Sequence, residues 1–232
     1  MPSIAEAVQA LQPVDAESAN YLDYHRRRYR YLMEAVARVS PTRILDVGMS
    51  YQTLLLRKLY PSAELETIGY FDYRFPRTPE VRHTEFDLNL AADEAAWPEC
   101  GSFDVIVMAE VIEHLHVAPT HVLRMFRKML RPGGAIVLQT PNTINLARRI
   151  TLLFGQSPFR VIRDDPKNPG HFCEYTVEQL REVAARCQMS AGEWSLSNYF
   201  GSGRGWQRIY NGLCAILPGQ LHEGITIILR VL

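Results

Sequence analysis

Two carboxylates and an imidazole stand within five residues of one another, directly after an apolar run. The run, residues 105–108, is unbroken and rich in valine and isoleucine, as expected for a central parallel strand that is covered on both faces. Glu110, Glu113 and His114 follow it. Because ligands of open α/β sheets bind just beyond the carboxyl ends of the strands, the sequence predicts that these side chains lie where chemistry takes place.

A second imidazole, His171, ends the long connection that follows the next apolar run, residues 135–138. Neighbouring parallel strands lie roughly 4.8 Å apart, so the loops that leave them can share one site. Imidazole titrates near neutral pH, which makes His114 and His171 candidate catalytic bases. With Glu110 and Glu113 they also form a ligand set that suits Mg²⁺ or Mn²⁺. The alternative is structural, with Glu113 and His114 bracing the loop after the strand.

Three earlier segments place a carboxylate after an apolar strand pattern. They are residues 43–48, with Asp46 and Gly48, residues 64–72, with Asp72, and residues 81–89, with Asp87 and Leu88. The second half of the pattern has a strand, a helix, a Leu-Arg-Pro-Gly-Gly turn at residues 130–134 and another strand. Strands that alternate with helices in this way predict a parallel sheet.

This order of motifs resembles the class I S-adenosylmethionine (SAM) methyltransferases, in particular types 11 and 23 and the ubiquinone-biosynthesis O-methyltransferases. The resemblance covers roughly residues 43–186. It implies an α/β fold of Rossmann-like type, with a seven-stranded, mostly parallel sheet, helices on both faces and an antiparallel last strand. It also implies that the cofactor is SAM, and the residues expected to bind it are Asp46, Gly48, Ser50, Asp72, Asp87, Leu88 and Glu110.

Two features depart from the family's cofactor motif. Ser50 and Gln52 occupy places where the family usually carries glycine, a residue needed where the backbone takes a positive φ or approaches a ligand closely. Asp72, whose counterpart accepts hydrogen bonds from ribose hydroxyls, stands one residue late. Asp46, Asp72 or Asp87, taken alone, is equally explained as a turn or cap residue. Their order along the chain favours a cofactor site.

The segments outside these motifs carry candidate substrate contacts. Residues 16–39 predict one or two helices with tyrosines among arginines, which either line the acceptor pocket or only cover the sheet. The connection over residues 141–175 predicts a helix at 145–154 and a loop at 157–170, and loops of this kind often carry function. The candidate substrate contacts are Tyr21, Tyr24, Arg28 and Asn142.

The last third of the chain completes the predicted sheet. Thr176, with Gln179 three residues later, is a capping box that opens a helix. Strands are expected over residues 193–197 and 225–229. Between them, residues 206–217 predict an amphipathic helix, which either touches a membrane or a lipid-linked acceptor or packs on its own domain or a second subunit of a homodimer.

Composition limits the other possibilities. Twenty-five basic residues balance twenty-five acidic ones among 232, which disfavours nucleic acid as a partner. The four cysteines have no short paired spacing, which argues against a zinc site and favours a cytoplasmic location. No apolar run is long enough to span a bilayer. We expect one domain over residues 1–232, with a helical cover at 1–40 and a helical insertion at 198–222.

The expected cofactor defines the expected chemistry. The methyl group of SAM is already electrophilic, so the protein must align and desolvate the reactants, and an oxygen acceptor must also lose a proton. We predict O-methylation of a small-molecule, glycan-type or lipid-linked acceptor. One alternative is a metal-dependent RNA 2′-O-methyltransferase, because the two carboxylates and two imidazoles resemble the metal ligands of enzymes that methylate small-RNA 3′ ends. Another is a non-catalytic methyltransferase-like module, suggested by Ser50 and Gln52.

Overall fold

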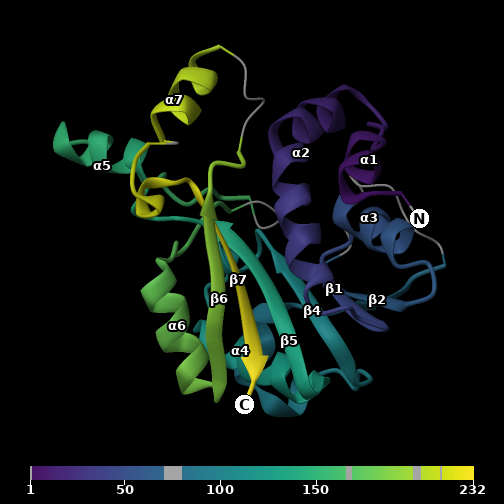
Figure 1. Ribbon diagram of the computed structural model, residues 1–232. Helices are drawn as coiled ribbons and strands as arrows, with labels where there is room; N and C mark the ends of the chain where they lie inside the picture. The colour runs from purple at the N-terminus through teal and green to yellow at the C-terminus, as the bar shows by residue number, and fades with distance from the viewer. Residues whose placement is uncertain (1, 71–79, 166–168, 201–204, 215) are drawn as a thin grey trace.

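The computed structural model describes residues 2–70, 80–165, 169–200, 205–214 and 216–232. Within these residues the chain forms a seven-stranded sheet in the order β3-β2-β1-β4-β5-β7-β6 (Figure 1). The strands are β1 (Arg43–Val47), β2 (Glu64–Gly69), β3 (Arg82–Glu85), β4 (Phe103–Ala109), β5 (Leu130–Pro141), β6 (Met189–Ser197) and β7 (Gly224–Val231). β1 to β5 pair in parallel, whereas β7 runs antiparallel to both of its neighbours. The predicted fold class is confirmed.

Helices cover both faces of this sheet. They are α1 (Ile4–Gln9), α2 (Ala16–Ala37), α3 (Tyr51–Leu59), α4 (Pro119–Met129), α5 (Leu146–Leu153), α6 (Val177–Arg186) and α7 (Trp206–Cys214). The core on one face joins α1, α2 and α3 to Val105 and Val107 of β4. The core on the other face joins α4 and α6 to Ile106 and Met108. Alternate residues of β4 therefore serve opposite cores, as predicted for a strand covered on both faces.

The chain reverses its direction of winding between β1 and β4. These strands are neighbours, with Ile44 opposite Val105, but β1 leads through α3 to β2 on one side and β4 leads through α4 to β5 on the other. Such a topological switch point opens a crevice beyond the carboxyl ends of the strands, where ligands bind in folds of this kind. The turn after β1 and residues 110–114 meet there.

Capping residues place most helices where the sequence predicts them. Residues 16–37 form one helix with Asp15 as its N-cap. Asn145 caps α5, and Thr176 with Gln179 forms the predicted capping box of α6. α1 was not predicted, although Ser3 and Glu6 form a capping box at its start. No helix among the described residues is long and apolar enough to cross a membrane.

Several boundaries differ from the expectation; β6, for example, begins at Met189 rather than at residue 193. The Arg-Pro-Gly-Gly segment was predicted as a turn before β5, but it lies inside the strand as an irregularity. β4 pairs Phe103 with Leu130 and Val105 with Ala135, so the intervening residues of β5 bulge out, and Gly133 supplies a positive φ of 75°. α7 also ends at Cys214 rather than at residue 217, ahead of Pro218.

Candidate active site

Two glycines keep the backbone open at the carboxyl ends of β1 and β2. Gly48 has φ +81°, and its amide donates to the carbonyl of Ile68 at 2.8 Å. A Cβ added at Gly48 would meet no atom within 4 Å, so the space in front of it is free for a ligand. Gly69 has φ +127°, and a Cβ there would lie 3.5 Å from the Gly48 nitrogen. Both positions favour glycine.

Asp46 stabilises the turn that follows β1 by accepting hydrogen bonds from residues of that turn. Its carboxylate is completely buried, and its two oxygens accept hydrogen bonds at 2.6 Å, one from Gln52 Nε2 and one from Thr53 Oγ1. Burial raises the pKa of Asp46 to about 7, although the bonds from Thr53 and Gln52 lower it. Asp46 therefore shapes the turn through partners within the chain. Gln52, which was questioned as a replacement for glycine, is one of these partners.

Ser50 takes a conformation that needs no glycine. Its φ of −157° is extended backbone that any residue adopts, and its side chain caps α3 by accepting from the Gln52 amide. The Ser50 amide donates in turn to Thr53 Oγ1 at 2.9 Å. The turn departs from the family's glycine pattern, and the side chains of residues 50, 52 and 53 stabilise it with hydrogen bonds.

The third predicted carboxylate lies at the carboxyl end of β3. Asp87 accepts from the Asn89 amide at 2.9 Å and begins a short 3-10 helix, Leu88–Ala92. Burial raises its pKa, but hydrogen bonds from Tyr70 and Asn89 outweigh this and lower it overall. Asn89 Oδ1 accepts from the His116 amide at 2.9 Å, which joins this end of the sheet to the loop after β4. Asp72 lies outside the described residues.

Glu110 combines a strained backbone with an unpaired carboxylate oxygen. It follows β4 at φ +57°, a left-handed conformation that costs a residue other than glycine about 1–3 kcal/mol. Its Oε1 is buried without a hydrogen-bond partner among the described residues. Burial and repulsion by Glu113 raise its pKa. Strain and an unsatisfied buried group are both features that cluster at functional sites.

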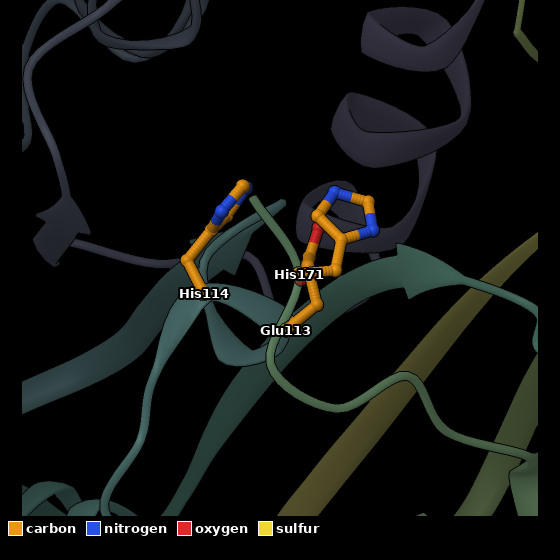
Figure 2. Close-up of side chains that lie close together, drawn as sticks. All are labelled: Glu113, His114 and His171. Carbon is orange, nitrogen blue, oxygen red and sulfur yellow. The ribbon is translucent and has the colours of Figure 1, made fainter. Parts of the chain in front are cut away.

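The next turn brings the two predicted imidazoles together. The short 3-10 helix Ile112–His114 holds Glu113, whose carbonyl accepts from the Phe172 amide at 2.8 Å. His114 Nδ1 lies 2.9 Å from the carbonyl of Gly170. The rings of His114 and His171 are 4.7 Å apart, nearly perpendicular, beside Glu113 (Figure 2). The structure thus places both imidazoles in one site.

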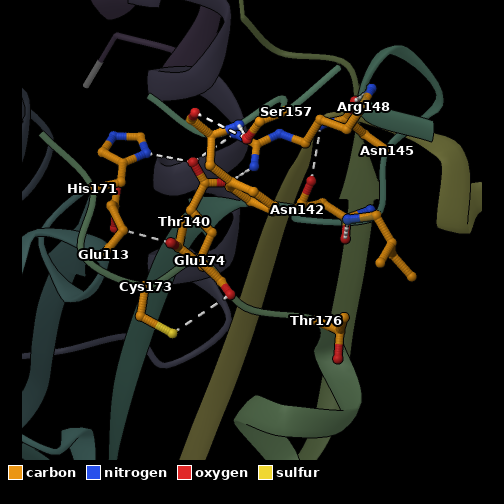
Figure 3. Close-up of polar contacts among 12 residues, drawn as sticks. Glu113, Thr140, Asn142, Asn145, Arg148, Ser157, His171, Cys173, Glu174 and Thr176 are labelled. Atoms are coloured by element: carbon orange, nitrogen blue, oxygen red, sulfur yellow. Dashed lines mark hydrogen bonds and ion pairs between the residues drawn. The ribbon is translucent and has the colours of Figure 1, made fainter. Parts of the chain in front are cut away.

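His171 is oriented by a buried ion pair that the sequence analysis missed. Its Nδ1 lies 2.5 Å from Glu174 Oε1, and Arg148 Nη2 donates to the same oxygen (Figure 3). Burial raises the pKa of Glu174, but its bonds to His171 and Arg148 outweigh this and lower it. The three-residue spacing of His171 and Glu174 was a visible signal. Arg148 gave none, because it stands on α5, far away in the sequence.

Three of the four proposed metal ligands form a compact group. Ligand atoms of Glu113, His114 and His171 all lie within 4.8 Å of one another, whereas Glu110 is not part of this group. Glu113 is completely buried; its Oε2 accepts from Thr140 Oγ1 at 2.9 Å, and its Oε1 has no partner among the described residues. Burial raises its pKa.

A cavity of about 640 Å³ opens beyond these groups. It lies among α2, the turn after β4, α5 with its following loop, and the segment before β7. Among its lining residues are Tyr24, His25, Glu110, His114, Asn145, Arg148, Phe159, Arg160, His171, Glu174, Phe200 and Glu223. Of the four candidate substrate contacts, Tyr24 lines the cavity. Tyr21 is half-buried against His25, and Asn142 donates to the carbonyls of Gln220 and His222 at 2.9 and 2.8 Å.

The fourth candidate, Arg28, is buried behind the cavity rather than exposed in it. Its guanidinium is 1% exposed, lies over the ring of Tyr29, and has no hydrogen-bond partner for Nε or Nη1 among the described residues. Its charge acts on both Asp46 and Glu110, which places it behind the ends of β1 and β4. Buried charges are normally paired, and the buried carboxyl groups of Asp46 and Glu110 are the acidic groups on which this guanidinium acts.

Together these features define a Rossmann-like α/β protein with its site at the topological switch point. Residues 6–188 match the family of methyltransferase domains. The match covers most of the chain, and the chain belongs to this family.

Individual relatives are similar over part of their length. A "Probable S-adenosylmethionine-dependent methyltransferase" of Mycolicibacterium smegmatis is 38% identical over 117 residues, which are 50% of this chain and 37% of that protein. The ubiquinone biosynthesis O-methyltransferase of Xanthomonas axonopodis pv. citri is 26% identical over 144 residues, 62% of this chain and 51% of that protein. The chain thus spans about half or less of these curated relatives.

The fold agrees with a solved structure of the same class. The crystal structure of a SAM-dependent methyltransferase from Archaeoglobus fulgidus matches with a TM-score of 0.58 at 15% identity, over 88% of this chain and 94% of that one. At this identity the likeness concerns the fold.

Proposed function

We propose that the chain transfers the methyl group of SAM to an oxygen atom of an acceptor held in the cavity. The observation that carries this is the His114–His171 pair, which lines the cavity beside the turn that receives the cofactor in this fold. The acceptor oxygen forms a bond to the methyl carbon, the carbon–sulfur bond of SAM breaks, and the acceptor proton passes to an imidazole. The acceptor class is a small molecule or a glycan-type or lipid-linked amphiphile.

The cofactor fits the residues that lie at the switch point. SAM supplies an electrophilic methyl group when it is bound. Gly48 offers backbone without a side chain in the way. Arg28 offers a buried guanidinium, whose Nε and Nη1 have no hydrogen-bond partner among the described residues, for a carboxylate such as that of the methionine part. Asp87 and Leu88 lie at the end of β3, where the adenine part is expected, and Asp72 stays a predicted ribose contact.

Hydrogen bonding defines which imidazole nitrogen can take a proton. A backbone carbonyl only accepts, so Nδ1 of His114 carries the hydrogen and Nε2 keeps its lone pair. Burial and the neighbouring His171 lower the pKa of His114, which keeps it neutral at pH 7. His171 gives Nδ1–H to Glu174, and its Nε2 is likewise free to accept.

Of the two, His171 is the base in this proposal. The buried carboxylate of Glu174 stabilises the imidazolium that forms when Nε2 takes the acceptor proton, in the manner of a histidine–carboxylate pair. His114 contacts the Gly170 carbonyl and the edge of the His171 ring, so its role in this proposal is to position the ring of His171. Arg148 fixes Glu174 and is a positioning residue.

Two measurements test this proposal. Calorimetry with SAM and S-adenosylhomocysteine comes first, and no heat at millimolar ligand would leave the non-catalytic module as the better account. Next, labelled SAM is incubated with phenolic and sugar-hydroxyl acceptors. With any acceptor that the wild type methylates, His171→Gln should slow turnover by about 10²–10⁴-fold and keep SAM affinity. The control is His121→Gln on α4, and an unchanged rate in His171→Gln would exclude this residue as the base.

A metal-assisted form of the same transfer is the second candidate. It is favoured by the group of Glu113, His114 and His171, in which each imidazole has Nδ1 engaged and Nε2 available. A bound Mg²⁺ or Mn²⁺ would lower the pKa of the acceptor hydroxyl. Calorimetric titration with Mn²⁺ tests it without any acceptor. Heat in the wild type that is lost in His114→Ala supports the metal, whereas no heat in the wild type leaves His171 as base alone.

A further inference from the structure

The helix α5 and the loop after it expose many apolar side chains among the described residues. None of the eight residues of α5 is buried. Leu153 is 81% exposed, Phe154 76% and Val161 90%. We name the exposed side chains the apolar ridge, and they are Ile150, Leu152, Leu153, Phe154, Phe159, Val161 and Ile162. So short a helix is marginal in water without packing, so contact with another body would stabilise it.

The same segment carries an excess of positive charge. Residues 142–170 contain four arginines and one lysine against Asp164 and Asp165. Arg148 is paired with Glu174 inside the site, but Arg149 and Arg160 are exposed beside the apolar ridge. Apolar side chains flanked by arginines match an anionic bilayer, where the former enter the acyl boundary and the latter contact lipid phosphates.

The apolar ridge is continuous with the mouth of the cavity. Phe159 and Val161 of the ridge also line the cavity, and Arg160 stands between them. α5 and α7 both project beyond the carboxyl ends of the parallel strands, away from the body of the sheet (Figure 1). A flat surface that touched the ridge would therefore lie next to the opening through which an acceptor enters.

We propose that the apolar ridge docks this protein on an anionic phospholipid bilayer, with the cavity opening toward it. The acceptor is then an amphiphile of that bilayer, whose polar end enters the cavity while its apolar part stays in the lipid. The choice of acceptor rests on the proposed methyl transfer. Docking itself does not, because it uses side chains outside the machinery of transfer.

Charge favours a bilayer over a second copy of the chain. In a two-fold dimer the same patch faces itself, so its excess of positive charge, five basic residues against two acidic ones over residues 142–170, would oppose the contact. An anionic surface has no such repulsion and attracts each arginine near it.

The chain offers a matched pair of variants for the test. Leu153 on the ridge is 81% exposed, and Leu232 at the other end of the molecule is 80% exposed. Leu153→Glu and Leu232→Glu make the same chemical change at sites of the same exposure. Wild type and both variants are sedimented with vesicles of phosphatidylcholine alone and with vesicles that contain about one third phosphatidylglycerol.

We expect the wild type to bind the anionic vesicles and to lose that binding at high salt. Leu153→Glu should bind roughly tenfold or more weakly, while Leu232→Glu stays within about twofold of the wild type. Equal binding by the two variants, or no preference for anionic vesicles, would overturn the proposal. So would a wild-type dimer in solution that Leu153→Glu dissociates, because the ridge would then be a contact between copies.

Docking and catalysis can fail separately in this design. Leu153→Glu should bind SAM as the wild type does, and His171→Gln should bind vesicles as the wild type does. Loss of vesicle binding with normal SAM binding removes only the docking proposal. Absence of SAM binding with normal vesicle binding removes only the methyl transfer.

Discussion

Gly48 and Ser50 lie two residues apart in one turn, but their backbones adopt different conformations. Gly48 needs a positive φ and an empty space before it, whereas Ser50 is extended and uses its side chain as a cap. Gly48→Val should therefore abolish measurable SAM binding and cost about 1–3 kcal/mol of stability. Ser50→Gly should leave SAM affinity within about twofold and cost a few tenths of a kcal/mol. Calorimetry and thermal unfolding of both variants measure this.

One result for Ser50→Gly would contradict this prediction. If Ser50→Gly restored a family-like glycine and thereby tightened SAM binding tenfold, the capped turn would be a hindrance, and the module without catalysis would gain support.

Substitution of Arg28 tests whether this residue binds the cofactor or the acceptor. Its unpaired nitrogens are buried near Asp46 and Glu110. A charged hydrogen bond to a carboxylate is worth about 1.5–3 kcal/mol, so Arg28→Met should weaken SAM binding about 10- to 100-fold. Affinity for 5′-methylthioadenosine, which lacks the amino-acid part, should stay the same. The control is Arg27→Met, an exposed neighbour on α2.

Two other results would give Arg28 another role. Equal losses for SAM and 5′-methylthioadenosine would mean that the residue only supports the fold. Unchanged affinity for both SAM and 5′-methylthioadenosine would favour a contact between Arg28 and the acceptor, which is the role that the sequence predicted.

At the scale of elements, hydrophobic period and capping residues were sufficient to predict most of the structure. β4 shows why, since a run such as residues 105–108 can be satisfied only by burial on both faces. Thr176 and Gln179 mark the start of α6 equally directly. The bulge in β5 could not be predicted, because whether Gly133 turns the chain or lies inside a strand depends on the pairing with β4.

The ion pair behind His171 shows the same limit within the site. Glu174 is close to His171 in sequence, but Arg148 reaches it from α5. Long-range pairs of this kind depend on the path of a loop, and spacing along the chain does not report it. Similarly, Asp46 and Ser50 were expected at the cofactor, and only the structure shows that their side chains bond to the turn itself.

Glu174→Gln tests whether these elements work together. In the proposed mechanism Glu174 supports His171, and it also pairs with Arg148, so the variant should lower kcat and the melting temperature while SAM affinity is kept. In the background of His171→Gln, the same substitution should have little further effect on kcat but should still lower the melting temperature. A full, additive loss of kcat in the double variant would contradict the positioning role.

At the scale of the whole molecule, net charge and overall hydrophobicity do not show where charged and apolar residues gather on the surface. The chain has no net charge, which argued against nucleic acid, yet residues 142–170 hold five basic residues against two acidic ones. The apolar side chains of α5 are exposed rather than packed in a core. Such asymmetry appears only when segments are placed on a surface, and it is what the docking proposal uses.

Buried carboxyl groups should give this molecule an unusual dependence of stability on pH. Burial raises the pKa of Asp46 to about 7, and burial also raises those of Glu110 and Glu113. Between the ordinary pKa of a carboxyl group, about 4, and these raised values, the folded chain holds more protons than the unfolded chain. The contribution of these three groups to the free energy of unfolding should therefore decrease as pH rises from about 5 to 8, opposed below pH 6.5 by His25, whose pKa burial lowers to about 3.

Asp46→Asn isolates one part of this effect. The amide keeps the size of the side chain and an acceptor for Gln52, but it carries no proton that is lost as pH rises. The free energy of unfolding of Asp46→Asn should thus decrease less between pH 5 and 7 than that of the wild type. The difference is about 1.4 kcal/mol for each unit by which the fold raises the pKa of Asp46. Urea unfolding at several pH values measures the slopes, and Asp93→Asn, at an exposed helix cap, serves as the control.

A wild-type stability that rises from pH 5 to 7, or equal slopes in wild type and Asp46→Asn, would show that Asp46 is already ionised in the folded protein. Its charge would then be balanced by Arg28, which would leave that guanidinium unavailable to the cofactor.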